Sequence, residues 1–294
     1  MSIPRNDIPG FTPARAAPDG IGIAYEHGGS GPPLLLLHGF PQTRAMWAEV
    51  APELARYFTV ICPDLRGYGE SAKPSGVENY SFRAMARDML ALMQGLGFDR
   101  FHLAGHDRGA RTAHRLALDA PEAVLSLTVM DIVPTHLLLT QLTYSVARAY
   151  YHWFYMAQPE PFPERMIAAD PEAYYTSCLL GFGKATLDDF KPAQLAAYRA
   201  AWGDPDCRRA MCDDYRAAIE IDVHHDAEDL ARRVTCPALV LYGAVGAMAR
   251  AYDVPATWAD RLSDMRAEAI PGGHFFIDQS PGATVRALRG FLSV

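Results

Sequence analysis

The stretch that decides the fold is Phe101-His-Leu-Ala-Gly-His-Asp107-Arg-Gly-Ala-Arg111. An apolar run ends in Gly105-x-Asp107-x-Gly109, and a segment of helical period follows. This is the strand–turn–helix pattern of a nucleophile elbow, with an aspartate where serine is usual. The two glycines relieve the crowding of so sharp a turn. A helix N-terminus capped by Asp107 has the same sequence pattern, so this stretch alone does not distinguish an elbow from an ordinary helix cap.

On both sides of this stretch, from residue 32 onward, short apolar runs alternate with longer segments of helical period. That alternation is typical of a mostly parallel, doubly wound α/β sheet. We expect strands near residues 34–37, 59–62, 101–104, 125–130, 238–242 and 266–270. We expect helices at residues 44–57, 81–96, 108–119, 254–262 and 283–291.

Residues 134–226 break this alternation, because they carry no strand-like run and are rich in aromatic residues and helix formers. The sequence therefore predicts a helical cap inserted after one of the strands, over the carboxyl ends where such sheets bind ligands. The expected division is a core in two parts, residues 1–133 and 229–294, with the cap at residues 134–228.

An elbow that supports acyl chemistry needs a second backbone N–H group from the loop after a neighbouring strand. The apolar run at residues 34–37 leads directly into His38-Gly-Phe40, so we expect the N–H groups of Phe40 and Arg108 to form an oxyanion hole. A base is expected at His274 in Pro271-Gly-Gly-His274, because the loop after the last strand can reach the elbow.

The acid that orients His274 has two candidates. Asp131 ends the predicted strand at residues 125–130, and Asp253 follows the strand at residues 238–242. We choose Asp131, because its strand lies next to that of Asp107. Asp253 falls near a predicted helix start, where an aspartate is usually a cap.

Several motifs, spread over nearly the whole chain, point to the same protein family. They are His38-Gly-Phe-Pro-Gln-Thr43, Asp64-Leu-Arg-Gly-Tyr-Gly69, Gly105-His-Asp-Arg-Gly-Ala-Arg111, Asp131-Ile-Val-Pro-Thr135, Tyr151-His-Trp153, Cys212-Asp-Asp-Tyr-Arg216 and Gly272-Gly-His-Phe-Phe276. With them the sequence resembles the α/β-hydrolase family, and within it the branch of fluoroacetate dehalogenases and the related epoxide hydrolases. The resemblance implies an α/β-hydrolase fold with a helical cap, and Asp107 as nucleophile, His274 as base and Asp131 as acid.

The resemblance also implies the reaction, the hydrolysis of a small haloacid such as fluoroacetate to glycolate and halide. An aspartate nucleophile suits it, because a carboxylate can displace a group at a saturated carbon. Arg108 and Arg111, one and four residues after Asp107, would hold the substrate carboxylate. The halide would be bound by cap residues, namely His152, Trp153 and Tyr215. By resemblance we also expect a homodimer.

Other readings stay open. An epoxide hydrolase uses the same Asp-His-Asp machinery and is the main alternative. A haloalkane dehalogenase fits less well, because that branch places tryptophan directly after the nucleophile, where this chain has Arg108. A binding module that has lost turnover usually lacks part of the catalytic machinery, whereas Asp107, Asp131 and His274 are all present in this chain. Phe182 stands where close relatives carry tryptophan, and the smaller ring either widens the pocket or only packs within the cap.

Composition limits the remaining partners. The 27 basic residues are scattered among 34 acidic ones, giving a net charge of −7, so we expect no nucleic-acid partner. No apolar stretch approaches the roughly 18 residues of a membrane span, and the first ten residues lack a signal-peptide core. We therefore expect a cytoplasmic protein that does not bind membranes. Five irregularly spaced cysteines fit no zinc or disulfide pattern, and we expect no metal or cofactor.

Overall fold

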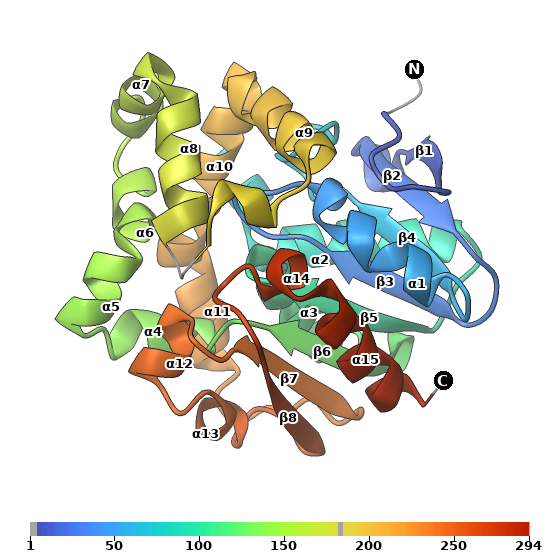
Figure 1. Ribbon diagram of the computed structural model, residues 1–294. Helices are drawn as coiled ribbons and strands as arrows, with labels where there is room; N and C mark the ends of the chain where they lie inside the picture. Colours follow the sequence, from blue (N-terminus) through green and yellow to red (C-terminus); the bar gives the residue numbers. More distant parts are fainter. Residues whose placement is uncertain (1–4, 182–184, 294) are drawn as a thin grey trace.

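The computed structural model describes residues 5–181 and 185–293 and centres on one eight-stranded sheet (Figure 1). The strand order is β1-β2-β4-β3-β5-β6-β7-β8. β1 and β2 are antiparallel to their neighbours, and the other pairs are parallel. The strands are β1 (Thr12–Ala16), β2 (Ile23–Gly28), β3 (Pro33–Leu37), β4 (Thr59–Pro63), β5 (Phe101–His106), β6 (Val124–Met130), β7 (Ala238–Gly243) and β8 (Met265–Ile270). The expected α/β class and mostly parallel sheet are confirmed.

Helices cover both faces of this sheet, with α2 and α3 on one face and α1 and α15 on the other (Figure 1). The strands between them are apolar on both sides, as expected of a covered parallel sheet. The core helices are α1 (Ala51–Leu54), α2 (Phe82–Gly95), α3 (Arg108–Asp119), α12 (Ala247–Ala251), α13 (Val254–Trp258), α14 (Phe276–Gln279) and α15 (Pro281–Leu292).

Two sequence expectations differ from the structure. The antiparallel hairpin of β1 and β2 was not expected, because β1 is a five-residue edge strand that contains Pro13 and buries little. The single helix expected at residues 44–57 is a 3-10 segment, Arg44–Glu49, followed by the short α1. Pro52 explains the break, because proline has no N–H group for the interior of a helix.

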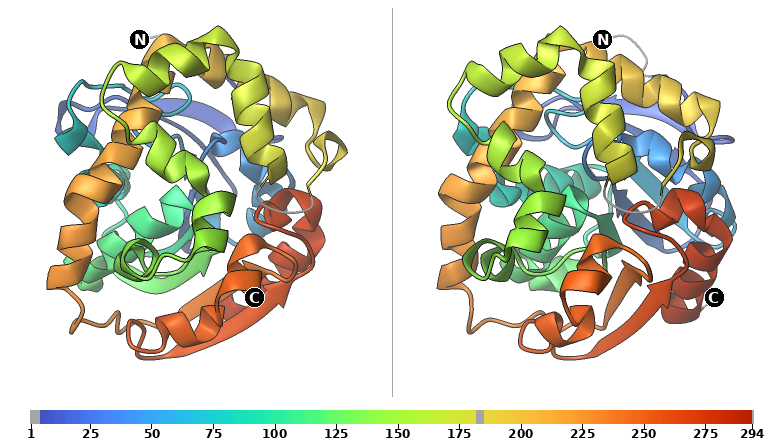
Figure 2. Two further views of the ribbon diagram at one scale, coloured as in Figure 1. Left: turned by 90° about the vertical axis from the view of Figure 1, so that its left-hand side faces the viewer. Right: turned by 60° about the vertical axis from the view of Figure 1, so that its left-hand side comes forward.

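Between β6 and β7 the chain forms a run of helices that lies in front of the sheet when the molecule is turned (Figure 2). They are α4 (Thr135–Thr140), α5 (Tyr144–Ala149), α6 (Tyr151–Met156), α7 (Phe162–Ala169), α8 (Pro171–Gly181), α9 (Pro192–Gly203), α10 (Pro205–Ala217) and α11 (Val223–Glu228), with a π-helical segment, Ala218–Asp222, joining the last two. The domain boundaries expected after residues 133 and 228 stay a prediction.

Hydrogen bonds tie α9 to the core loop that follows β3. The buried Asp278 carboxylate accepts from Gln42 Nε2 at 2.9 Å and from Gln194 Nε2 of α9 at 3.0 Å. Trp202 Nε1, also in α9, donates to Pro41 O at 2.7 Å. This half of the cap is therefore joined to the core by buried polar contacts, which are costly to leave unpaired.

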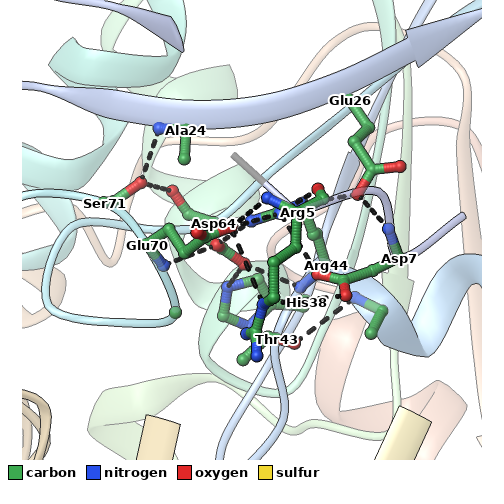
Figure 3. A network of polar contacts seen from close by, with 12 residues as sticks. Arg5, Asp7, Ala24, Glu26, His38, Thr43, Arg44, Asp64, Glu70 and Ser71 are labelled. Atoms are coloured by element: carbon green, nitrogen blue, oxygen red, sulfur yellow. Dashed lines mark hydrogen bonds and ion pairs between the residues drawn. The ribbon is translucent and has the colours of Figure 1, made fainter. Parts of the chain in front are cut away.

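A buried ionic network lies behind the same loop and is built around Arg44 (Figure 3). The Arg44 guanidinium donates to Glu26 Oε1 at 2.9 Å and to Glu70 Oε2 at 2.7 Å, and it forms a further short ion pair with Asp64. It also lies 3.1 Å from Asp7 Oδ2. The cation thus holds the N-terminal segment, β2 and the loop after β4 together at one point.

All five cysteines are free thiols. Within residues 5–181 and 185–293 no helix has both the length and the apolar character needed to cross a membrane. The same residues contain no group of three or more histidine, cysteine or acidic side chains able to hold a metal ion.

The packing at the elbow predicts different effects of adding a methyl group to two glycines. At Gly105 an added Cβ would lie 2.4 Å from Gly109 O, whereas at the exposed Gly95 of α2 it would meet nothing within 4 Å. We expect Gly105→Ala to lower the free energy of unfolding by about 1–3 kcal/mol through overpacking. Gly95→Ala is expected to leave it unchanged or to raise it by up to about 1 kcal/mol. Urea unfolding followed by circular dichroism measures both, and equal stability of the two variants would contradict the argument.

Candidate active site

The turn after β5 has the geometry of a nucleophile elbow. Asp107 adopts φ 48° and ψ −115°, a left-handed backbone conformation that is rare outside glycine. Added Cβ atoms at Gly39 and Gly109 would lie 2.5 Å from Asp107 Cβ and 2.3 Å from His38 O. Asp107 precedes α3 without a capping hydrogen bond from its side chain. The alternative of an ordinary helix cap is therefore wrong.

The Asp107 carboxylate is buried and points at the loop after β3. Phe40 N donates to Asp107 Oδ2 at 3.0 Å, so one of the two N–H groups expected in the oxyanion hole lies at the carboxylate. Arg108 is the first residue of α3, where an N–H group has no acceptor within the helix. Burial acts to raise the pKa of Asp107, but the neighbouring positive charges, His274 first, outweigh it and lower this pKa below its ordinary value.

His274 lies against Asp131, not Asp253. His274 Nδ1 is 2.6 Å from Asp131 Oδ2, and Gly243 N donates to Asp131 Oδ1 at 2.8 Å. Burial acts to lower the pKa of His274, but the hydrogen bond to Asp131 and the charges of Asp131 and Asp107 together raise it. Asp253 instead caps α13, accepting from Ala256 N at 3.1 Å, as the sequence predicts.

His106 supports this pair, a role that its place in the elbow motif does not predict. Its Nε2 donates to His274 O at 2.8 Å, and the two rings lie 4.6 Å apart between centroids. Burial and the neighbouring His274 lower the pKa of His106 to about 3. His106 is therefore neutral at physiological pH and holds the His274 loop without adding charge.

Arg108 and Arg111 both lie beside the elbow, but in different surroundings. Arg111 Nη1 donates to Val133 O and to Thr135 Oγ1, each at 3.0 Å, and burial lowers its pKa to about 10. Arg108 Nε donates to Asp214 Oδ2 at 2.9 Å, and its Nη2 forms a second, short bond to the same carboxylate. The sequence does not predict Asp214 as the partner of Arg108, because it lies 106 residues further along the chain, in α10.

The three cap residues expected at the halide lie together above the elbow. The Tyr215 ring packs edge-on against the rings of His152 and Trp153, with centroids 5.4 and 5.3 Å apart. Phe40 stacks on His152 at 5.5 Å. Burial lowers the pKa of His152 and raises that of Tyr215, so the imidazole is neutral and the phenol keeps its proton. Phe182 lies outside the described residues.

The fold and this constellation define the class of protein. A family model described as the alpha/beta hydrolase fold matches residues 32–281, and the chain belongs to the α/β-hydrolase family. The chain is 55% identical over 269 residues to a fluoroacetate dehalogenase from a Burkholderia species. The aligned residues cover 90% of this chain and 88% of that protein. The expected resemblance to this branch of the family is thereby confirmed.

More distant relatives agree with the same class. A soluble epoxide hydrolase from Corynebacterium sp. (strain C12) is 30% identical over 284 residues, 92% of this chain and 93% of that protein. Among solved structures, a protein from Nostoc sp. PCC 7120 that is proposed to be an alpha/beta hydrolase superposes with a TM-score of 0.94. It is 44% identical and covers 96% of this chain and 98% of that one.

The His274–Asp131 contact predicts how His274 titrates. Replacing Asp131 by Asn keeps an oxygen for Gly243 N but removes the charge that helps to raise the His274 pKa. We expect Asp131→Asn to lower the pKa of His274. An NMR titration of the imidazole carbon-bound protons measures it, with the distant His102 as internal control. An unchanged His274 pKa would mean that Asp131 does not stabilise its cation.

Proposed function

We propose that this protein hydrolyses small haloacids, with fluoroacetate or another haloacetate converted to glycolate and halide. The observation that carries the proposal is an ionised carboxylate, Asp107, enclosed between the Arg111 cation and the hydrogen-bond donors of the cap. An anionic substrate with a halogen on its α-carbon matches both sets of groups. The relative named as a fluoroacetate dehalogenase supports the same substrate class.

In the first step Asp107 attacks the α-carbon, the carbon–halogen bond breaks, and halide leaves with the bonding electron pair. The lowered pKa of Asp107 keeps its carboxylate ionised at neutral pH, as an attacking group requires. Arg111, together with Arg108, would bind the substrate carboxylate. His152, Trp153 and Tyr215 would donate to the departing halide, whose negative charge develops in the transition state.

In the second step water attacks the carbonyl carbon of the Asp107 ester, with His274 taking the proton. The ester carries no charge, so one of the groups that raise the His274 pKa is lost once it forms. Ester formation therefore favours neutral His274, the form that can act as a base. Asp131 stabilises the imidazolium that results, and the N–H groups of Phe40 and Arg108 would bind the oxyanion. The oxyanion then collapses, the bond between the Asp107 carbonyl carbon and the ester oxygen breaks, and His274 gives its proton to the departing glycolate oxygen, which restores the Asp107 carboxylate.

The epoxide-hydrolase alternative fits this site less well. The same Asp107, His274 and Asp131 could open an epoxide, and Tyr215 could polarise its oxygen. A neutral epoxide, however, gives the buried Arg111 no charge to pair with once Asp107 has become a neutral ester, and burying an unpaired cation is costly. A haloacid supplies the carboxylate that this cation lacks.

We infer that the protein is a cytoplasmic homodimer, because the sequence lacks a signal-peptide core and resembles a dimeric branch of the family. Sedimentation equilibrium at several protein concentrations measures the assembly, and a single species with the 32.3 kDa mass of one chain would contradict it.

The reaction predicts fluoride release. We expect purified protein incubated with fluoroacetate to release fluoride, read with an ion-selective electrode, and Asp107→Asn to lose at least about 1,000-fold in rate because an amide is a poor nucleophile. Chloroacetate and styrene oxide serve as comparison substrates. Diol from styrene oxide with no halide release from either haloacid would favour the epoxide-hydrolase alternative instead.

The two-step scheme predicts a trapped intermediate. We expect His274→Ala to leave the displacement possible and to block hydrolysis, so that the ester accumulates on Asp107. With fluoroacetate, intact-protein mass spectrometry should show one added carboxymethyl group, located on the peptide that contains Asp107. Unmodified protein with full turnover would rule out His274 as the base. The variant Asp107→Asn, treated in the same way, should stay unmodified.

A further inference from the structure

The ion pair between Arg108 and Asp214 is fully buried and joins the core to the cap. Three hydrogen bonds run from the guanidinium to Asp214, including one from Nη2 to the backbone oxygen at 2.7 Å. Tyr68 donates at 2.7 Å to Asp214 Oδ2, the oxygen that also accepts from Arg108 Nε. Neither side chain of the ion pair is exposed to solvent. The position of the Arg108 guanidinium is therefore set by the cap residue Asp214.

The contacts of Arg108 leave one donor unused. Among the described residues, Arg108 Nη1 has no hydrogen-bond partner, although it is buried. The guanidinium lies 4.4 Å from the ring centre of Tyr215 and 4.9 Å from that of Trp153. Asp214 is adjacent to Tyr215 in the chain, so one turn of α10 fixes both a carboxylate-binding group and a halide-binding group.

The two arginines of the site differ in charge balance. Arg111 donates to two neutral oxygens, and within residues 5–181 and 185–293 it forms no ion pair with a carboxylate within 4 Å. Arg108 is matched by Asp214, so this pair adds donors without adding net charge. Apart from the nucleophile Asp107, whose charge acts on both arginines, Arg111 is thus the arginine of the site whose charge a bound anion can neutralise.

We propose that Asp214 is a positioning residue. It cancels the charge of Arg108, which limits the anion affinity of the active site, and it directs the free Nη1 of Arg108 toward the substrate. This inference rests on the proposed function, because the anions concerned are the haloacid and its two products. Glycolate and halide both leave as anions from an enclosed site. A second uncompensated cation in a medium of low dielectric constant would hold them there.

The experiment measures binding of acetate, an unreactive carboxylate, by the change in tryptophan fluorescence, to which Trp153 contributes. Asp214→Asn removes the compensating charge, and we expect acetate to bind about tenfold more tightly than to the parent protein. The matched control is Asp213→Asn on the same helix, whose carboxylate pairs with Arg209 and Arg216 outside the site. It should leave acetate affinity within about twofold of the parent.

A double variant keeps the test valid if Asp214→Asn fails to fold, because replacing both members of a buried pair leaves no unpaired charge. We expect Arg108→Gln with Asp214→Asn to bind acetate about threefold more weakly than the parent, because the Nη1 donor is lost while the net charge is unchanged, and Arg111→Gln to bind it more than about tenfold more weakly. Acetate binding by the double variant as weak as that of Arg111→Gln, or unchanged affinity in folded Asp214→Asn, would overturn the proposal. Absence of acetate binding to the parent would overturn it too.

The binding measurement is independent of turnover. Fluoride release by the parent is measured in the same buffer. If the parent protein binds acetate and the variants change this affinity as expected, but the parent releases no fluoride, the proposed reaction is wrong. The role of Asp214 in anion binding would still hold. Fluoride release combined with unaltered acetate binding in the variants would support the proposed reaction and overturn the proposed role of Asp214.

Discussion

The active site depends on one close backbone contact, between the loop after β3 and the turn after β5. Gly39 and Gly109 lie at this contact, where an added Cβ atom would lie 2.5 Å from Asp107 Cβ and 2.3 Å from His38 O, and Gly105 faces Gly109 within the turn itself. That contact brings Phe40 N within hydrogen-bond distance of Asp107 and forces Asp107 into a left-handed conformation. The strain of this conformation is held in place by sheet hydrogen bonds on both sides, as is common at functional sites.

Buried charge is distributed around this contact in a consistent way. Behind the loop, Arg44 pairs with several carboxylates and so fixes the chain that follows Phe40 (Figure 3). Beyond the elbow, Arg108 is paired with Asp214 and His274 with Asp131. Among residues 5–181 and 185–293, Arg111 forms no ion pair within 4 Å, and the carboxylate whose charge acts on it most is the nucleophile Asp107. The arrangement keeps the site near neutrality while leaving one positive charge for an anionic substrate.

Much of this could be predicted from the sequence, because its signals are local. The glycines around Asp107, the strand that ends at Asp131 and the loop that contains His274 all follow apolar runs that mark parallel strands. Asp131 could be preferred to Asp253 because neighbouring strands bring their carboxyl ends together. The cap segment was visible from its lack of strand-like runs, although its domain boundaries and the roles of its residues remain predictions.

What the sequence could not predict depends on contacts between distant residues. In Cys212-Asp-Asp-Tyr-Arg216, successive residues of a helix point about 100° apart, and nothing in the sequence says that Asp214 rather than Asp213 faces Arg108. The Arg44 network joins residues from four separate segments, so no short motif contains it. The hairpin of β1 and β2 was missed because an edge strand with Pro13 lacks the apolar pattern of a central strand.

The cap is attached to the core by buried polar contacts, and these limit which of its parts can move independently. Helices α9 and α10 are joined to the core by buried hydrogen bonds and an ion pair, through Gln194, Trp202 and Asp214. Displacing α10 from the core would break the Arg108–Asp214 bonds and separate the Tyr215 ring from the Arg108 guanidinium at the same time. The elbow and this part of the cap therefore form one mechanical unit.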